Sequence, residues 1–223
     1  LILKTVLSAK ERLGSHKDFI PLELGCHNYM EMNLFPPVLK KLSEEFPLLR
    51  PNIRLIPFPS LLSMIENNQV QAALGVKNEQ KLSPLLFREL CSAPTTCVCS
   101  PEHPLAQHKV LTKEQLTGNY IACSPRQIPD SLFTIQSGIL GSLLPGQRFF
   151  AENVESAFAI AKALPAYTLY PDIPHARDSG LCYIPVTDLP RISFGVYYQY
   201  GLDQPVLKRF LTLISGYMKE AQA

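Results

Sequence analysis

The stretch Phe19-Ile20-Pro21-Leu22-Glu23-Leu24-Gly25-Cys26-His27-Asn28-Tyr29 and the helical pattern behind it decide the fold class. Apolar and polar side chains alternate along 19–25, which predicts a half-buried strand. Apolar residues then recur every fourth position in a helix near 31–46 that ends before Pro47. A strand that enters a helix through a short polar turn presents N–H groups and partial positive charge, and small ligands bind there in open α/β sheets.

The first part of the chain continues as a βαβαβ unit. We expect a strand over 53–57, a helix from Ser60 to Asn67-Asn68, and a strand over 70–76. The last of these strands is rich in apolar residues, which is typical of a central strand in a parallel sheet.

A second α/β unit is predicted over 95–188, after a short strand at 85–87 and a break at Ser92-Ala93-Pro94. Asn153 is the expected N-cap of one of its helices. The unit's expected strands lie at 95–100, 120–123, 149–151, 167–170 and 182–186.

The last strand, 191–199, and a helix after Asp203 follow a complete second unit, so we expect the chain to return to the first unit. The predicted fold is α/β, with two Rossmann-like lobes joined by two crossover strands, near 91–94 and 188–191. This is a periplasmic-binding-protein-like (type 2) architecture, and a cleft between two such lobes suits a small molecule.

Composition excludes several classes of protein. The chain has 223 residues, 46% of them hydrophobic and 18% charged, so a packed core is expected and disorder is not. A net charge of +2 is too balanced to predict contact with nucleic acid by this chain itself. There is no run of about 18 apolar residues and no signal peptide, so neither a membrane span nor secretion is predicted.

The six cysteines include no C-x-x-C pair, and a domain of this size does not need disulfides. We therefore predict reduced, mostly buried thiols in a cytoplasmic protein. Two alternatives stay open: a reactive Cys26 thiolate, because a helix N-terminus lowers a thiol pKa, and a metal site formed by Cys26, His27, Cys97 and Cys99.

The sequence contains none of the common nucleophile, phosphate-binding, zinc-protease or dinucleotide-binding motifs. Glu152 and Glu155 lie near a helix start, where carboxylates compensate the helix dipole. The prediction is therefore a binding protein without a cofactor, not an enzyme, with a periplasmic solute-binding protein as the alternative.

Several strings together resemble the effector-binding domain of LysR-type transcriptional regulators. They occur in the family's order and spacing over about 19–219. The strings are Leu34-Phe35-Pro36-Pro37-Val38-Leu39, Phe46-Pro47, the run from Leu61 to Leu74-Gly75-Val76, Leu86-Phe87-Arg88-Glu89, Ser100-Pro101-Glu102-His103-Pro104-Leu105 and Leu169-Tyr170-Pro171. The chain departs from the family at Leu164-Pro165-Ala166, where a Gly-Leu-Gly is usual, and at Gln71, where Asp is common.

The resemblance implies that residues 1–16 end a linker helix from a preceding helix-turn-helix domain, since the chain begins at Leu1 without Met. It divides the chain into lobe I, 17–92 with 190–223, and lobe II, 93–189. It further implies that a small-molecule effector binds in the cleft, that dimers or tetramers form, and that DNA is bound only through the preceding domain.

The resemblance also implies which residues contact the effector, because family members use the turns after particular strands. Asn28, Ser124 and Asn153 are short polar groups near expected helix starts, and three converging helix N-termini favour an anion or a carbonyl-rich metabolite. Lys77 is the nearest cation for an acidic effector, but few other basic residues map to the cleft, so a weakly charged or largely apolar effector stays open. The implied positions are Cys26, His27, Asn28, Tyr29, Met30, Gly75, Val76, Lys77, Ser124, Pro125, Asn153, Pro171 and Ile173.

Overall fold

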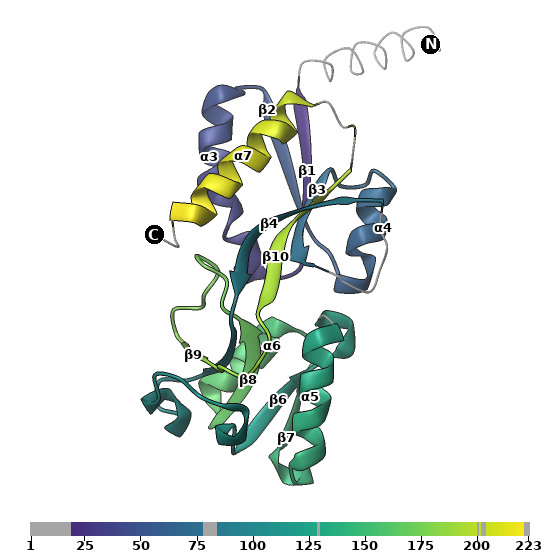
Figure 1. The fold of residues 1–223 in the computed structure, drawn as a ribbon. Coiled ribbons are helices and arrows are strands. Elements are labelled where there is room, and N and C mark those ends of the chain that lie inside the picture. Colours follow the sequence, from purple (N-terminus) through teal and green to yellow (C-terminus); the bar gives the residue numbers. More distant parts are fainter. Residues whose placement is uncertain (1–18, 78–83, 129, 200, 202–203, 221–223) are drawn as a thin grey trace, which may run out of the picture.

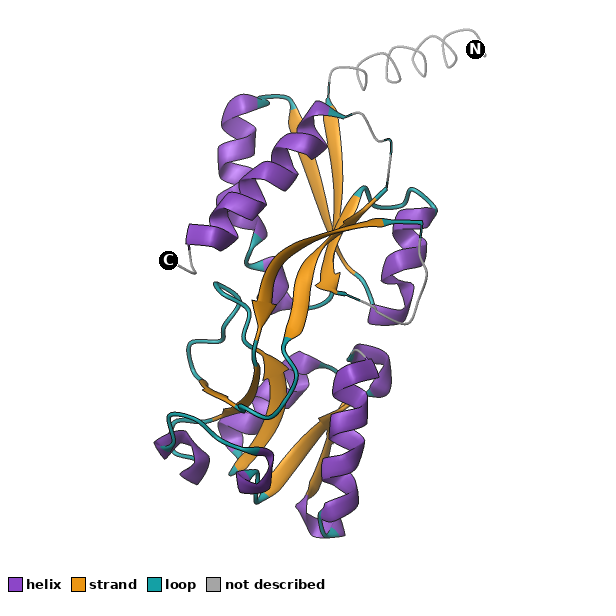
Figure 2. Cartoon of the chain, in the orientation of Figure 1, coloured by secondary structure: helices purple, strands orange, loops and turns teal. Residues whose placement is uncertain are grey.

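The computed structural model describes residues 19–77, 84–128, 130–199, 201 and 204–220 (Figure 1). The predicted linker helix, 1–16, lies outside the described residues. Each of the two halves is a sheet covered by helices, and two long strands of the upper half run down to the waist between them (Figure 2). Within the described residues, none of the helices has the length and apolar character needed to cross a bilayer.

Lobe I is built on a five-stranded sheet with the order β2-β1-β3-β10-β4. β1 pairs in parallel with β2 and β3, whereas β10 pairs antiparallel with β3 and β4. The apolar strand β3 is therefore central, as its sequence predicts. The bounds are β1 Ile20–Cys26, β2 Leu49–Leu55, β3 Ala72–Val76, β4 Leu86–Ala93 and β10 Ile192–Tyr198.

Lobe II is built on a second five-stranded sheet with the order β7-β6-β8-β5-β9. The parallel strands β7, β6 and β8 continue into β5 and β9 by antiparallel pairing. The bounds are β5 Thr95–Cys99, β6 Asn119–Cys123, β7 Arg148–Ala151, β8 Ala166–Pro171 and β9 Cys182–Pro185. Together the two sheets confirm the predicted α/β architecture of the type 2 periplasmic-binding-protein-like class.

Helices cover the faces of both sheets. α3 and α7 pack together on one side of lobe I, where the rings of Phe35 and Phe210 lie 6.1 Å apart, and α4 lies on the other side (Figure 1). In lobe II, α6 packs against β5, β6, β7 and β8, and α5 contacts β6. The bounds are α2 Tyr29–Met32, α3 Phe35–Glu45, α4 Leu61–Glu66, α5 Asp130–Ser142, α6 Val154–Ala163 and α7 Pro205–Glu220.

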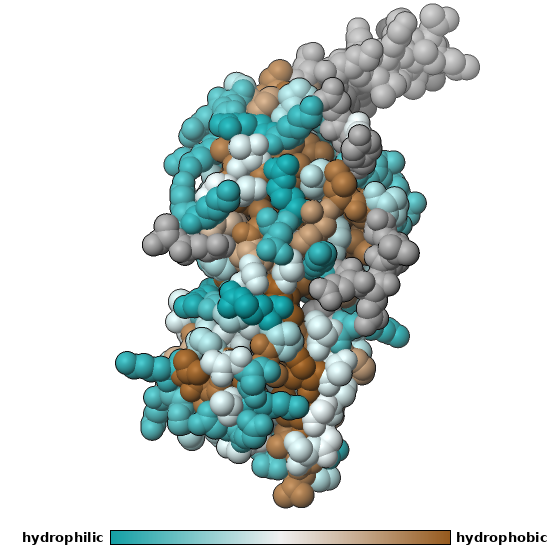
Figure 3. All heavy atoms as spheres, viewed as in Figure 1, coloured by the Kyte–Doolittle hydropathy of each residue, from teal (hydrophilic) through white to brown (hydrophobic). Residues whose placement is uncertain are grey.

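Hydrophobic and hydrophilic side chains separate as the sequence patterns indicate. On the face shown in Figure 3, hydrophilic atoms cover much of the surface, and hydrophobic atoms show between them in both lobes. The apolar positions of α3, among them Val38 and Leu42, are buried, which is the stripe that its four-residue spacing predicts.

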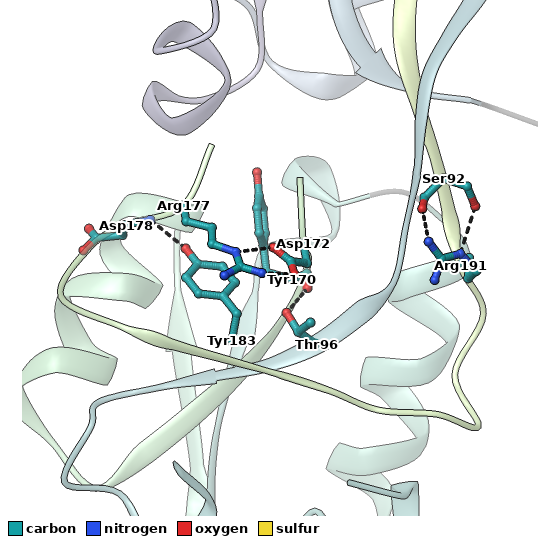
Figure 4. A network of polar contacts seen from close by, with 8 residues as sticks. All are labelled: Ser92, Thr96, Tyr170, Asp172, Arg177, Asp178, Tyr183 and Arg191. Atoms are coloured by element: carbon teal, nitrogen blue, oxygen red, sulfur yellow. Dashed lines mark hydrogen bonds and ion pairs between the residues drawn. The ribbon is translucent and has the colours of Figure 1, made fainter. Parts of the chain in front are cut away.

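The two crossovers lie side by side at the waist. β4 ends at Ala93 and β5 begins at Thr95, so only Pro94 separates a strand of lobe I from a strand of lobe II. At the return crossover, Arg191 donates from Nε to the Ser92 hydroxyl at 3.1 Å and from Nη2 to the Ser92 carbonyl oxygen (Figure 4). These bonds tie the outgoing and returning strands together.

Three predicted elements differ from the structure. The helix expected near 31–46 is divided into α2 and α3, because Pro36 and Pro37 lack the N–H groups that would continue α2, and they occupy the first turn of α3 instead. The strand expected at 53–57 runs from Leu49 to Leu55. The strand expected at 85–87 continues to Ala93, so Ser92 and Ala93 belong to β4 and Pro94 alone breaks it.

We predict that Gly195→Ala destabilises lobe I. A Cβ at Gly195 would overlap the Arg88 carbonyl oxygen and lie 2.7 Å from the Phe87 ring, at the irregular register between β10 and β4. Overpacking of this kind costs about 1–3 kcal/mol, which denaturant unfolding measures. Gly216→Ala is the control, since a Cβ at that exposed position of α7 meets nothing within 4 Å. Equal stability of the two variants would contradict the close approach.

Candidate functional site

A pocket lies between the two lobes and is walled by both. Its free volume is about 30 Å³, which is room for a few water molecules, because one water needs roughly 10–15 Å³ by this measure. Lobe I contributes His27, Asn28, Glu31, Phe58, Gly75 and Val76, and lobe II contributes Ile128, Leu132, Val154, Tyr170, Pro171 and Ile173.

The polar end of the pocket is the turn between β1 and α2. Asn28 is the N-cap of α2, and its Oδ1 accepts from the backbone N–H of Glu31 at 2.9 Å. The Glu31 carboxylate turns back to accept from the backbone N–H of His27 at 2.8 Å and from Asn28 Nδ2 at 3.2 Å. This Asn-x-x-Glu arrangement is a variant of the capping box, and it holds the turn rigidly.

Two polar contacts join the lobes at this end. Asn28 Nδ2 donates to the hydroxyl oxygen of Tyr170 at 2.9 Å, and Figure 4 shows the Tyr170 hydroxyl pointing from lobe II toward lobe I. The backbone N–H of Tyr29 donates to Oε1 of Glu155, the second residue of α6, at 2.8 Å. The N-terminus of α2 therefore contacts carboxylates from both lobes.

A third contact joins the lobes away from the pocket. The ring of His175 in lobe II stacks on the ring of Tyr217 in α7, with centroids 4.3 Å apart and planes 16° apart. His175 has a φ of 63°, in the left-handed region that non-glycine residues seldom adopt. Beside it, Arg177 forms an ion pair with Asp172 and lies over the Tyr183 ring (Figure 4).

Burial dominates the electrostatics of Glu31. The residue is 4% exposed, and burial raises the pKa of its carboxyl to about 7, with a smaller increase from the charge of Glu155. The nearby His27 and the hydrogen bonds from His27 and Asn28 oppose that rise. No Lys or Arg side chain is among the described residues that line the pocket.

Apolar side chains form the remaining walls. Phe58 meets the ring of His27 edge-on, with centroids 5.7 Å apart, and His27 Nδ1 lies 3.2 Å from the carbonyl oxygen of Ile56. Phe158 packs edge-on against Tyr170 at 5.4 Å and fixes the direction of that ring. The site thus combines a small polar end with a larger apolar surface, as small-molecule sites do.

The structure brings some of the predicted effector-contacting residues to this pocket and leaves others elsewhere. His27, Asn28, Gly75, Val76, Pro171 and Ile173 line it. Ser124 and Pro125 line a separate groove in lobe II, between α5 and the ends of β6 and β7. For all of these residues, contact with a ligand stays a prediction.

The other predicted residues do not line the pocket. Cys26 and Met30 are buried in the core, Tyr29 is 57% exposed, and Lys77 is exposed. Asn153 acts as the N-cap of α6, where its Oδ1 accepts from the Ser156 N–H at 2.8 Å.

The sequence did not predict six of the twelve residues that line the pocket. Glu31 had a detectable signal, since Asn28-x-x-Glu31 is a capping pattern directly after a strand. Tyr170 lay within a string used for the family resemblance but was not assigned to the site. Phe58, Ile128, Leu132 and Val154 had no local signal, because only the packing of the two lobes brings these apolar side chains together.

The two cysteine alternatives find no support. Burial raises the pKa of the Cys26 thiol, and the charges of Glu31 and Glu155 raise it further, so the N-terminus of α2 does not produce a thiolate. Across the described part of the chain, no three His, Cys, Asp or Glu side chains are grouped as metal ligands would be. Cys26 and His27 belong to lobe I, while Cys97 and Cys99 are buried in lobe II. The structure holds six cysteines without disulfides, and all but Cys182 are buried.

Comparison with known proteins identifies the class. The model of the LysR substrate binding domain family matches residues 21–219, so this chain belongs to the family of LysR-type regulator effector-binding domains, as the sequence strings predict. The solved structures that it resembles include regulators of this family. Among curated proteins, the sequence comparison found no match.

Three solved structures illustrate the likeness in fold. HinK, a LysR family transcriptional regulator from Pseudomonas aeruginosa, gives a TM-score of 0.72 at 12% identity, covering 96% of this chain and 77% of that one. The BenM effector-binding domain with its effector benzoate gives 0.68 at 16%, covering 90% and 92%. The regulatory domain of MetR from Neisseria meningitidis gives 0.65 at 16%, covering 90% and 94%.

We predict that Glu31 makes stability depend on pH. Its carboxyl binds protons more tightly when folded, with a pKa of about 7 against 4.5 for the ordinary group. The contribution of Glu31 to the free energy of unfolding is therefore greatest below about pH 4.5 and falls as the pH rises to about 7, by on the order of 3 kcal/mol. Denaturant unfolding across this range should show the fall in the parent protein and a reduced fall in Glu31→Gln.

The exposed residue Glu44 of α3 provides the control. Glu44→Gln should retain the pH dependence of the parent protein, because this side chain is exposed and lies outside the pocket. If Glu31→Gln and Glu44→Gln followed the same pH profile, the buried carboxylate would not be its source.

Proposed function

We propose that this domain binds a small-molecule effector in the pocket between its lobes. The observation that carries the proposal is the hydrogen bond from Asn28 to Tyr170, because it joins the lobes at the polar end of a pocket that both lobes wall. A ligand that competes for either partner acts directly on the contact between the lobes. Since the free volume is about 30 Å³, a ligand of more than a few heavy atoms must part the lobes to enter.

The polar contacts favour a particular ligand charge. Helix N-termini commonly hold anions, but at α2 the carboxylates of Glu31 and Glu155 already accept from the backbone N–H groups of His27 and Tyr29. An anionic ligand would meet these carboxylates with no Lys or Arg among the described lining residues to balance them. We therefore propose an effector with a cationic, hydrogen-bond-donating head and an apolar body, in place of the anion expected from the helix starts.

The proposed output is a change in the angle between the lobes, which are the predicted units 17–92 with 190–223 and 93–189. The tied crossover strands act as the hinge. Effector binding shifts the population between lobe arrangements and changes the packing of a dimer or tetramer, which repositions DNA-binding domains that precede this one. The domain itself performs no catalysis, and such a regulator works in the cytoplasm. The family match gives no support to the alternative of a periplasmic solute-binding protein.

Three probes of the same shape test the charge preference: benzylamine, benzyl alcohol and benzoate. Titration monitored by nuclear magnetic resonance at about pH 8, where Glu31 is ionised, should show benzylamine binding at least about tenfold more tightly than benzoate. Glu31→Gln should remove most of that preference. Tighter binding of benzoate would overturn the proposed ligand class.

We predict that Tyr170→Phe favours separation of the lobes. The substitution removes the acceptor of Asn28 Nδ2 and costs about 1 kcal/mol, the usual net value of one hydrogen bond. Small-angle X-ray scattering should give a larger radius of gyration than for the parent protein. Tyr183→Phe is the matched control, because the Tyr183 hydroxyl accepts from Asp178 within lobe II. Identical scattering from both variants would argue against a role of the bond in lobe closure.

A further inference from the structure

A second hollow lies in lobe I directly beside the pocket between the lobes. It is formed where the turn Phe58–Ser60 and α4 pack over β3 and β10. Its free volume is about 60 Å³, several times the roughly 10–15 Å³ that one water molecule needs. We call it the side chamber, lined by Phe58, Leu61, Leu62, Gly75, Val76 and Tyr197.

The side chamber adjoins the pocket through shared walls. Phe58, Gly75 and Val76 line both spaces. Phe58 is half-buried, and its ring contacts His27 edge-on, so one aromatic side chain stands between the polar turn and the chamber. Phe58 belongs to a three-residue turn and not to the sheet, and we infer that rotation of its side chain is the step that joins the two spaces.

The chemistry of the side chamber is almost entirely apolar. Leu61 and Leu62 are buried, and the hydroxyl of Tyr197 is bonded to the Val76 carbonyl oxygen at 3.1 Å, so the face that this residue turns to the chamber is its ring. No side chain that ionises at neutral pH is among the described residues lining the chamber. Such a space favours alkyl or aryl groups and disfavours charge.

We propose that the side chamber receives the apolar tail of the effector while its cationic head lies at Asn28, Glu31 and Tyr170. This assignment rests on the proposed function and names the ligand class more closely, as a primary amine carrying a compact alkyl or aryl tail. The head and tail sites lie on opposite sides of Phe58, and the tail sets which amine is selected.

Gly75 controls the depth of the side chamber. A Cβ at this position would lie 3.5 Å from Leu61 Cδ1 and 3.8 Å from Tyr197 Cδ2, which is ordinary van der Waals contact with two chamber walls. Gly75→Ala is therefore accommodated by the fold and fills part of the space. Gly138→Ala is the matched control, because a Cβ at that exposed position of α5 meets nothing within 4 Å.

The test compares two homologous series, the n-alkylammonium ions and the n-alkanols from ethyl to octyl, by nuclear magnetic resonance titration. In the parent protein, affinity should rise roughly fourfold per methylene, the value for burial of one CH₂, until the chamber is full. In Gly75→Ala the rise should end about one methylene earlier than in the parent protein. Phe58→Ala should extend the rise to longer tails, and Gly138→Ala should match the parent.

The outcomes separate the two proposals. In one outcome, the affinity of the alkanols rises with chain length, Gly75→Ala shortens that rise, and the ammonium ions do not bind. This outcome would support the side chamber and overturn the cationic head. In a second outcome, the ammonium ions bind with an affinity that does not depend on chain length, or with an increase in affinity that Gly75→Ala leaves unaltered. Either result would overturn the side chamber but not the head site. If affinity did not rise with chain length in either series, the side chamber would not be a site for the tail.

Discussion

The structure depends on the return of the chain to its first sheet. β10 enters between β3 and β4, pairs antiparallel with both, and places Gly195 against the backbone of Arg88, where a side chain would not fit. Because the strand that completes lobe I follows lobe II in the sequence, the chain must cross the waist twice. The Arg191–Ser92 contacts hold those strands together at the waist.

The pocket follows from this constraint and from the N-terminus of α2. Crossover strands bring α6 and the end of β8 opposite the β1–α2 turn, where Glu155 and Tyr170 complete contacts begun by residues of lobe I. The protein's own carboxylates satisfy N–H groups that would otherwise attract an anion. The burial that lets them do so also raises the pKa of Glu31, so this carboxyl keeps its proton to a higher pH than an ordinary carboxyl does.

Local patterns predicted much of the fold and part of the site. Asn153 was predicted as a helix cap and is one, and the βαβαβ order and the central position of β3 are confirmed. The helix expected near 31–46 begins later, at Phe35, because Pro36 and Pro37 occupy its first turn, and the separate short helix α2 precedes it. Ser124 follows a strand as expected, but it lines the separate groove in lobe II and not the pocket between the lobes.

The sequence by itself determined the fold class, the family, the return crossover and the polar turn at Asn28, because each depends on spacing or on short motifs along the chain. Only the tertiary structure decided the character of the site. Whether Glu31 is buried, whether Tyr170 reaches Asn28, and whether Phe58 divides two apolar spaces depend on contacts between residues distant in sequence. Burial and charge at such contacts are properties of the packed lobes, and no local pattern encodes them.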